Sequence, residues 1–227
     1  MTLLLRPPGV YRAQDDTTLL LDVMHRGGYA TGRSVLDLGT GSGAMAVAAA
    51  RAGAMSVDAV DLSLRSVATA RANAWLHRAP VTVHRGDLFA PVAGRIFDLV
   101  LTNPPYVPSR GGLLPRHRMG RCWDGGPDGR ALLDPICDTG PGFLAPGGVL
   151  LLVQSEFSGE DATLRRLRAA GLDADVVGRA RIPFGPVLRE RASLLRQCGL
   201  LPAGQHDEGL VVIAGTLPGP TSVHPLS

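Results

Sequence analysis

The chain has 227 residues, of which 45% are hydrophobic, enough for the core of one medium-sized domain. Its formal charge of +3 permits an anionic partner without requiring one. Cys122, Cys137 and Cys198 are far apart and form no Cys-x-x-Cys pair, which indicates a reducing compartment and argues against a zinc site. No signal peptide is visible and no apolar stretch approaches the ~20 residues of a membrane span, so we expect a cytoplasmic protein.

The predicted elements alternate between strands and helices along the first two thirds of the chain. In chain order they are a strand at residues 34–38, a helix ending near residue 51, a strand at 57–60, a helix from the N-cap Ser63 to about residue 76, strands at 81–83 and 97–102, an irregular segment at 107–128, a helix from about 130, a strand at 149–153 and a helix at 160–170. Alternation of this kind predicts a parallel sheet with helices on both faces.

The last third of the chain follows a different pattern. Strands are predicted at 174–177 and 210–213, with an arginine-rich helix at 186–198 between them, and the two strands are expected to form an antiparallel pair at the sheet edge. We therefore expect an α/β fold, a Rossmann-like, doubly wound and mostly parallel seven-stranded sheet with an antiparallel edge strand. The Pro-rich ends, 1–9 and 217–227, are expected to be loose.

Acidic residues stand at the ends of the first three predicted strands, and a glycine loop at 39–43 follows the first. Asp37, Asp61 and Asp87 should therefore meet at the sheet edge where ligands bind in such folds. The glycines let a ligand approach the backbone at the start of a helix, and their spacing fits either a dinucleotide or another adenosyl cofactor. Asp37 favours S-adenosylmethionine, because a carboxylate suits its ammonium and sulfonium groups and disfavours a pyrophosphate.

The tetrapeptide Asn103-Pro104-Pro105-Tyr106 directly follows the fourth predicted strand. The two prolines have no backbone N–H, so their carbonyls can be left pointing into a site. The Asn103 side-chain oxygen and the Pro104 carbonyl can accept both N–H groups of a planar nitrogen while Tyr106 covers its face. Such a nitrogen occurs in a carboxamide or in the exocyclic amine of a base.

Residues 35–43, Val-Leu-Asp-Leu-Gly-Thr-Gly-Ser-Gly, together with this tetrapeptide resemble class I S-adenosylmethionine-dependent methyltransferases, and more narrowly the HemK-type protein-glutamine N5-methyltransferases. Residues 10–17 resemble the lead-in of short members of that family, and residues 123–130 resemble their glycine-rich stretch after the catalytic loop. The resemblance covers residues 10–155.

The chain departs from the family pattern in several places. Ala13 and Asp15 stand where the family lead-in has Pro and Glu, and residues 181–205 match nothing in the family. The separate N-terminal helical domain with which long bacterial members hold release factors is not expected, because the glycine loop begins at residue 39.

The resemblance implies a lead-in over the cofactor at 1–30, a methyltransferase domain at 31–216 and a loose tail at 217–227. It implies methyl transfer from S-adenosylmethionine to the side-chain amide nitrogen of a protein glutamine, in the family the Gly-Gly-Gln motif of a peptide chain release factor. The expected catalytic residues are Asn103, Pro104, Pro105 and Tyr106. The expected cofactor contacts are Thr17, Asp37, Gly39, Thr40, Gly41, Ser42, Gly43, Asp61, Leu62, Asp87, Leu88 and Asn103.

Two other acceptors stay open at this point. The same tetrapeptide suits the adenine amine, so an N6-adenine methyltransferase acting on RNA or DNA is one alternative, and a small-molecule N-methyltransferase is the other. A nucleic-acid enzyme needs a basic track and aromatic residues to hold an unpaired base, and the chain has only ten aromatic residues, five Phe, two Trp and three Tyr. We therefore expect a protein partner rather than nucleic acid or membrane, and leave open a small activating subunit such as short eukaryotic relatives use.

Overall fold

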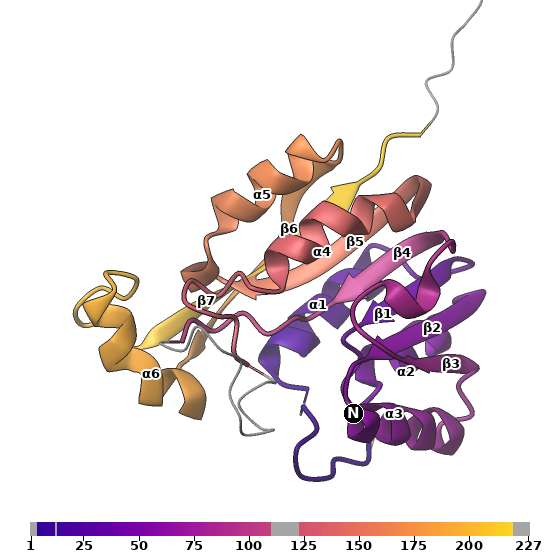
Figure 1. Ribbon diagram of the computed structural model, residues 1–227, viewed down its shortest axis with the longest axis horizontal. Helices are drawn as coiled ribbons and strands as arrows, with labels where there is room; N and C mark the ends of the chain where they lie inside the picture. The colour runs from indigo at the N-terminus through magenta and orange to yellow at the C-terminus, as the bar shows by residue number, and fades with distance from the viewer. Residues whose placement is uncertain (1–3, 12, 110–122, 220–227) are drawn as a thin grey trace, which may run out of the picture.

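The computed structural model describes residues 4–11, 13–109 and 123–219. Within this part of the chain, seven strands form one mixed sheet in the order β3-β2-β1-β4-β5-β7-β6 (Figure 1). The strands are β1 (Ser34–Leu38), β2 (Ser56–Asp61), β3 (Val81–Arg85), β4 (Phe97–Thr102), β5 (Leu144–Ser155), β6 (Asp173–Pro183) and β7 (Asp207–Thr216). The predicted fold class is confirmed.

Strands β1 to β5 are parallel, whereas β7 is antiparallel to both of its neighbours, β5 and β6. The strand order reverses between β1 and β4, the place where ligands bind in doubly wound sheets. Leu38 is paired with Thr102 at the ends of these two strands, and Thr102 Oγ1 donates to the Leu38 carbonyl over 2.9 Å. The glycine loop and the Asn-Pro-Pro-Tyr motif therefore leave the sheet side by side.

Helices cover both faces of the sheet (Figure 1). One core layer receives buried residues from α1 (Asp15–Arg26), α2 (Ala44–Arg51) and α3 (Leu64–Leu76), and the other from α4 (Leu133–Thr139), α5 (Glu160–Ala169) and α6 (Pro186–Gln197). Successive strand residues point to opposite faces, so Val35 packs in the first layer and Leu36 in the second. Neither has any exposed surface.

Sequence analysis did not identify α1. Its first turn contains Asp15, Asp16 and Thr17, which have low helix propensity. The apolar residues that follow were therefore not recognised as one face of a helix. Leu20 and Met24 on that face are fully buried, and the helix packs against β5, β6 and β7. Tertiary burial, together with acidic residues at the positive end of the helix dipole, explains why this segment is helical.

Three later elements differ from their predicted limits. β5 and β7 extend beyond 149–153 and 210–213, and β6 continues past residue 177 to Pro183. The extension of β6 carries exposed charges, since Arg179 pairs with Glu160 and Arg181 with Asp207, and sequence alone does not distinguish such an edge strand from a loop. α4 begins at Leu133 rather than near residue 130.

Both ends are held more firmly than expected. Leu5 exchanges two hydrogen bonds with the Asn73 side chain, so residues 4–9 are not wholly loose. Leu217 donates to the Gly148 carbonyl and accepts from Gly147 N–H, so the predicted loose tail does not begin there. The tail from residue 220 and most of the predicted irregular segment 107–128 lie outside the described residues. No helix of the described chain is long and apolar enough to cross a membrane.

Candidate active site

The loop from β1 to α2 follows a left-handed path at its three glycines. Gly39, Gly41 and Gly43 have φ angles of 76°, 55° and 83°, which other residues adopt only with strain. A Cβ at Gly43 would lie 3.1 Å from Ala70 of α3, so this glycine lets the loop pack closely. A Cβ at Gly39 would meet no atom within 4 Å, so that side of the loop is open to a ligand.

Asp37 lies directly below this loop with no exposed surface. Its Oδ2 accepts from Thr40 Oγ1 at 2.6 Å and from Ala46 N–H at 2.9 Å, whereas Oδ1 has no partner in the described chain. Burial raises the pKa of the carboxyl to about 7, against the opposing effect of these hydrogen bonds. A buried carboxylate oxygen without a partner fits a cationic ligand group.

Asp61 joins the end of β2 to the glycine loop. Its Oδ2 accepts from Gly41 N–H at 2.9 Å and its Oδ1 from Ser63 N–H at 2.8 Å. Burial raises its pKa, and the backbone bonds oppose that rise. Each oxygen keeps a second lone pair, so the carboxylate can still accept from ligand hydroxyls. Ser63 also caps α3, as predicted, by accepting from Ser66 N–H.

The segment after β3 reaches the same edge, where Gly86 N–H donates to the Asp61 carbonyl at 3.1 Å. Asp87 is exposed and its side chain has no hydrogen bond within the described chain. Leu88 has a φ of 41°, a conformation that costs a non-glycine residue ~1–3 kcal/mol and is typical of functional sites. Leu62 is exposed and touches none of these groups through hydrogen bonds.

Asn103 leaves β4 with its amide pointed at α1. Its Nδ2 donates to Thr17 Oγ1 at 3.1 Å and to Tyr11 OH at 3.4 Å. Neither Asn103 Oδ1 nor the Pro104 carbonyl accepts a hydrogen bond from the described residues. Two acceptors next to each other are thus left for a bound N–H group.

Asp16, which sequence analysis did not select, lies at the centre of this site. Its Oδ2 accepts from Tyr11 OH at 2.5 Å and from Tyr106 OH at 2.9 Å, and its Oδ1 accepts from Thr17 N–H at 2.6 Å. Burial and the neighbouring Asp16 charge raise the pKa of both tyrosines, so both hydroxyls keep their protons. The carboxylate therefore fixes two rings from distant parts of the chain.

A small pocket forms between the lead-in and the Asn-Pro-Pro-Tyr motif. The residues that line it are Tyr11, Asp16, Asn103, Pro104, Pro105, Tyr106, Val107 and Trp123. Tyr11 and Trp123 meet edge to face, with ring centroids 6.2 Å apart. The pocket thus combines aromatic walls with polar groups that mostly accept hydrogen bonds, which suits a planar amide.

Residues 107–109 and 123–126 pair with each other to form a stem beside the pocket. Val107 N–H donates to the Trp123 carbonyl at 2.9 Å, and Gly125 N–H donates to the Val107 carbonyl at 3.0 Å. Residues 110–122, whose four arginines are the best candidates in the sequence for a nucleic-acid contact, lie outside the described residues.

α6 holds the stem from outside the region that resembles the family. Arg191 Nη1 donates to the carbonyls of Val107 and Pro108, both at 3.1 Å, and its Nη2 lies 3.8 Å from Asp124 Oδ2. Asp124 is buried and accepts from Ser109 Oγ at 2.5 Å. The arginine-rich helix is therefore packed against the site, and Arg191 ties the two halves of the stem together.

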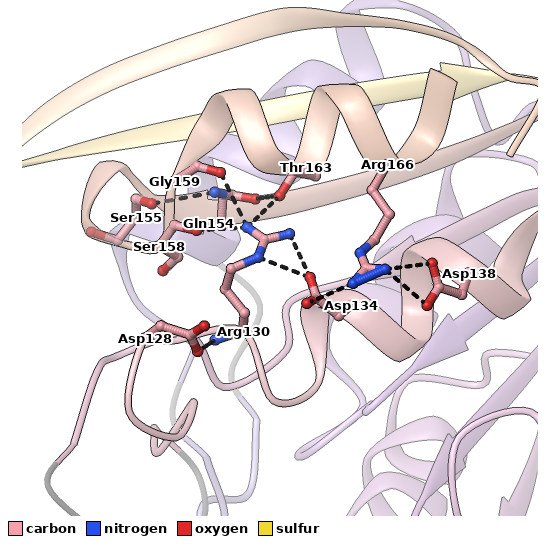
Figure 2. A network of polar contacts seen from close by, with 10 residues as sticks. All are labelled: Asp128, Arg130, Asp134, Asp138, Gln154, Ser155, Ser158, Gly159, Thr163 and Arg166. Atoms are coloured by element: carbon pink, nitrogen blue, oxygen red, sulfur yellow. Dashed lines mark hydrogen bonds and ion pairs between the residues drawn. The ribbon is translucent and has the colours of Figure 1, made fainter. Parts of the chain in front are cut away.

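Figure 2 shows a second arginine network, which is centred on Arg130. Arg130 Nη1 donates to the Ser158 and Gly159 carbonyls at 2.6 and 3.1 Å and to Thr163 Oγ1 at 3.1 Å. The Arg130 guanidinium also forms an ion pair with Asp134, at 2.6 Å. The network fixes the short turn at Ser158 to the start of α4.

This turn reaches the tyrosine of the motif. Ser158 Oγ donates to the Tyr106 carbonyl at 2.7 Å. A Cβ at Gly129 would lie 2.3 Å from the same carbonyl, so only glycine fits there. The backbone of Tyr106 is therefore held from below while its hydroxyl is held by Asp16.

The structure brings most of the predicted residues together. Asp37, Thr40, Gly41 and Asp61 form one bonded group around the glycine loop, and Thr17 contacts Asn103. Asp87, Leu88 and Leu62 lie at neighbouring strand ends, and their side chains make no hydrogen bond to that group within the described chain. The sequence analysis missed Tyr11, Asp16 and Trp123, although residues 10–17 and 123–130 carried the family resemblance and were the available signal.

Comparisons with known proteins identify the family of the chain. The sequence model of the methyltransferase small domain family matches residues 3–112. A putative protein N5-glutamine methyltransferase of Methanocaldococcus jannaschii is 34% identical over 181 residues, which cover 78% of this chain and 88% of that protein. The release factor glutamine methyltransferase of Gloeobacter violaceus is 42% identical over 147 residues, which cover 61% of this chain and 50% of that protein.

Solved structures share the fold. The E. cuniculi Mtq2–Trm112 complex, described as responsible for methylation of the eRF1 translation termination factor, aligns with a TM-score of 0.65 and 23% identity over 92% of this chain and 99% of that chain. The T. thermophilus 16S rRNA N2 G1207 methyltransferase, in complex with AdoMet and guanosine, aligns with a TM-score of 0.61 and 22% identity over 92% of this chain and 46% of that chain.

The sheet order and the match to the methyltransferase small domain identify the chain as a class I methyltransferase with S-adenosylmethionine as its cofactor. Within that class, the chain belongs to the protein-glutamine N5-methyltransferase family. It spans 88% of the M. jannaschii relative but about half the length of the G. violaceus and Geobacter sulfurreducens relatives.

Proposed function

We propose that this enzyme methylates the side-chain amide nitrogen of a glutamine in a protein, and that the protein is a peptide chain release factor. The observation that carries the proposal is a pair of acceptors, Asn103 Oδ1 and the Pro104 carbonyl, that accept no hydrogen bond from the described residues and lie in a pocket with aromatic walls. The names of the M. jannaschii and G. violaceus relatives support the choice of glutamine. We also place the reaction in the cytoplasm, where translation ends.

The cofactor would be held at the ends of the first three strands. Asp37 Oδ1 offers an unpartnered acceptor to the ammonium group, and Asp61 offers its remaining lone pairs to the ribose hydroxyls. We assign the adenine to the segment at Asp87 and Leu88. When bound, the cofactor supplies the methyl group on its sulfonium.

The residues of the motif compensate for a poor nucleophile. An amide nitrogen is unreactive because its lone pair is delocalised into the carbonyl group. Asn103 and Pro104 would accept its two N–H bonds and fix the direction of its lone pair, and positioning of this kind supplies several kcal/mol of the barrier. Positive charge that develops on the nitrogen strengthens both hydrogen bonds in the transition state. The proton that the product loses can pass to water at the pocket mouth.

The test is methyl transfer from labelled S-adenosylmethionine to a release factor, to the same factor with its Gly-Gly-Gln glutamine replaced, and to total RNA in separate reactions. We expect label only on the release factor that keeps its Gly-Gly-Gln glutamine. Asn103→Ala should abolish turnover while the Kd for S-adenosylmethionine changes less than about twofold, because Asn103 acts on the acceptor. Label on RNA, or on the factor without its glutamine, would refute the assignment.

We further propose a small activating subunit, as in the Mtq2–Trm112 complex. The side chains of Leu64 and Trp75 on α3 are 62% and 79% exposed, and they lie on one side of the helix, three turns apart. Exposed apolar surface of this kind is typical of a protein contact. A purified chain that turns over at full rate without a second protein would contradict the need for such a subunit.

A further inference from the structure

The amide of Asn103 faces two hydroxyl groups, those of Thr17 and Tyr11, at 3.1 and 3.4 Å. A hydroxyl group can either donate or accept, so these two contacts alone would permit either end of the amide to face them. The end that faces them matters, because the opposite end of the amide faces the acceptor pocket. An NH2 group there would repel the N–H groups of a substrate amide.

Asp16 removes this freedom. Tyr11 OH donates to Asp16 Oδ2 at 2.5 Å, and Thr17 Oγ1 donates to Asp16 Oδ1 at 3.3 Å. A carboxylate only accepts hydrogen bonds, so each hydroxyl commits its single hydrogen to Asp16. Both hydroxyls are then left with lone pairs alone for Asn103.

We propose that Asp16 is a positioning residue that sets the orientation of the Asn103 amide. Because both hydroxyls can only accept, Asn103 must present its NH2 group to them and its Oδ1 to the pocket. A rotated amide would lose both bonds and place oxygen against oxygen lone pairs. The inference rests on the proposed role of Asn103 as the acceptor of substrate N–H groups. It adds that Asp16 keeps the Asn103 oxygen turned toward the substrate.

Asp16→Asn tests the inference with almost no change in shape. The amide replaces one accepting oxygen with a donor, which returns one hydroxyl hydrogen to Asn103 and allows the Asn103 amide to rotate. We expect kcat to fall roughly 100-fold, as on loss of one oriented transition-state contact, with an unchanged Kd for S-adenosylmethionine. Asp15→Asn is the matched control, because Asp15 is exposed in the same helical turn, and it should keep the wild-type kcat. A fully active Asp16→Asn enzyme would overturn the inference.

A double substitution separates the effect of hydrogen-bond polarity from a general loss of structure at the site. Asn103→Asp places a carboxylate against two hydroxyls that have no hydrogen to give, so this variant should be inactive. Adding Asp16→Asn frees a hydroxyl hydrogen for that carboxylate and should recover kcat about tenfold or more over Asn103→Asp alone. A double variant no better than Asn103→Asp would overturn the inference.

The two proposals fail in different ways. No glutamine methylation by the wild-type enzyme would refute the proposed function and with it this inference. Glutamine methylation by the wild type together with an active Asp16→Asn variant would refute the positioning role alone.

Discussion

Asp37 leads to the prediction that binding of S-adenosylmethionine releases a proton. The free carboxyl has a pKa raised to about 7, because burial penalises its charged form. Its Oδ1 has no partner among the described residues, and a cationic group beside it would favour the ionised form. Binding therefore lowers the pKa, and the fraction of molecules that carry the proton must lose it.

The size of the effect follows from that pKa. With a value of about 7, about half of the free protein carries the proton at pH 7 and about nine tenths at pH 6. The sign follows from the raised pKa: affinity is highest above about pH 7 and is lost as the pH falls. The Kd for S-adenosylmethionine should therefore rise about fivefold between pH 7 and pH 6.

Titration calorimetry in two buffers of different ionisation enthalpy measures the protons released. We expect nearly one at pH 6 and about half of one at pH 7, and none from Asp37→Asn. Glu208→Gln is the control, because Glu208 is also buried with a pKa raised to about 7 but interacts with Asp16 rather than with the glycine loop. A binding enthalpy that does not depend on the buffer, or proton release that persists in Asp37→Asn, would refute the reasoning.

Two further predictions concern the arginines that support the site. Arg191→Met frees the stem, so the KM for the protein acceptor should rise about tenfold while the Kd for S-adenosylmethionine is unchanged. Arg196→Met, exposed on the same helix, is its control, and equal KM values would contradict the role of Arg191. Arg130→Met leaves the Ser158 and Gly159 carbonyls without their donor and removes one of the two arginines that pair with Asp134, so it should lower the urea unfolding free energy by ~3 kcal/mol. Arg165→Met on α5 is its exposed control, and a loss below ~1 kcal/mol for Arg130→Met would contradict the network.

Local patterns in the sequence were sufficient for the parallel half of the sheet. Short apolar runs predict β1, β2 and β4, because a strand that is buried on both faces is apolar on both. Ser63 was identified as a helix cap because a side-chain oxygen one residue before a helix satisfies its free N–H groups. The pairing of β1 with β4, which places the glycine loop beside Asn103, was seen only in the structure.

The sequence by itself thus determined the alternation of strands and helices in this half, the glycine loop after β1 and the tetrapeptide after β4. Only the tertiary structure showed that Asp16 contacts Tyr106, 90 residues away, and that Arg191 reaches Val107 across 84 residues. Neither contact can be predicted from the local sequence. The periodicity of apolar residues indicates which face of an element is buried, but not which side chain that face contacts. The polar residues that orient the site are therefore defined by packing between distant segments.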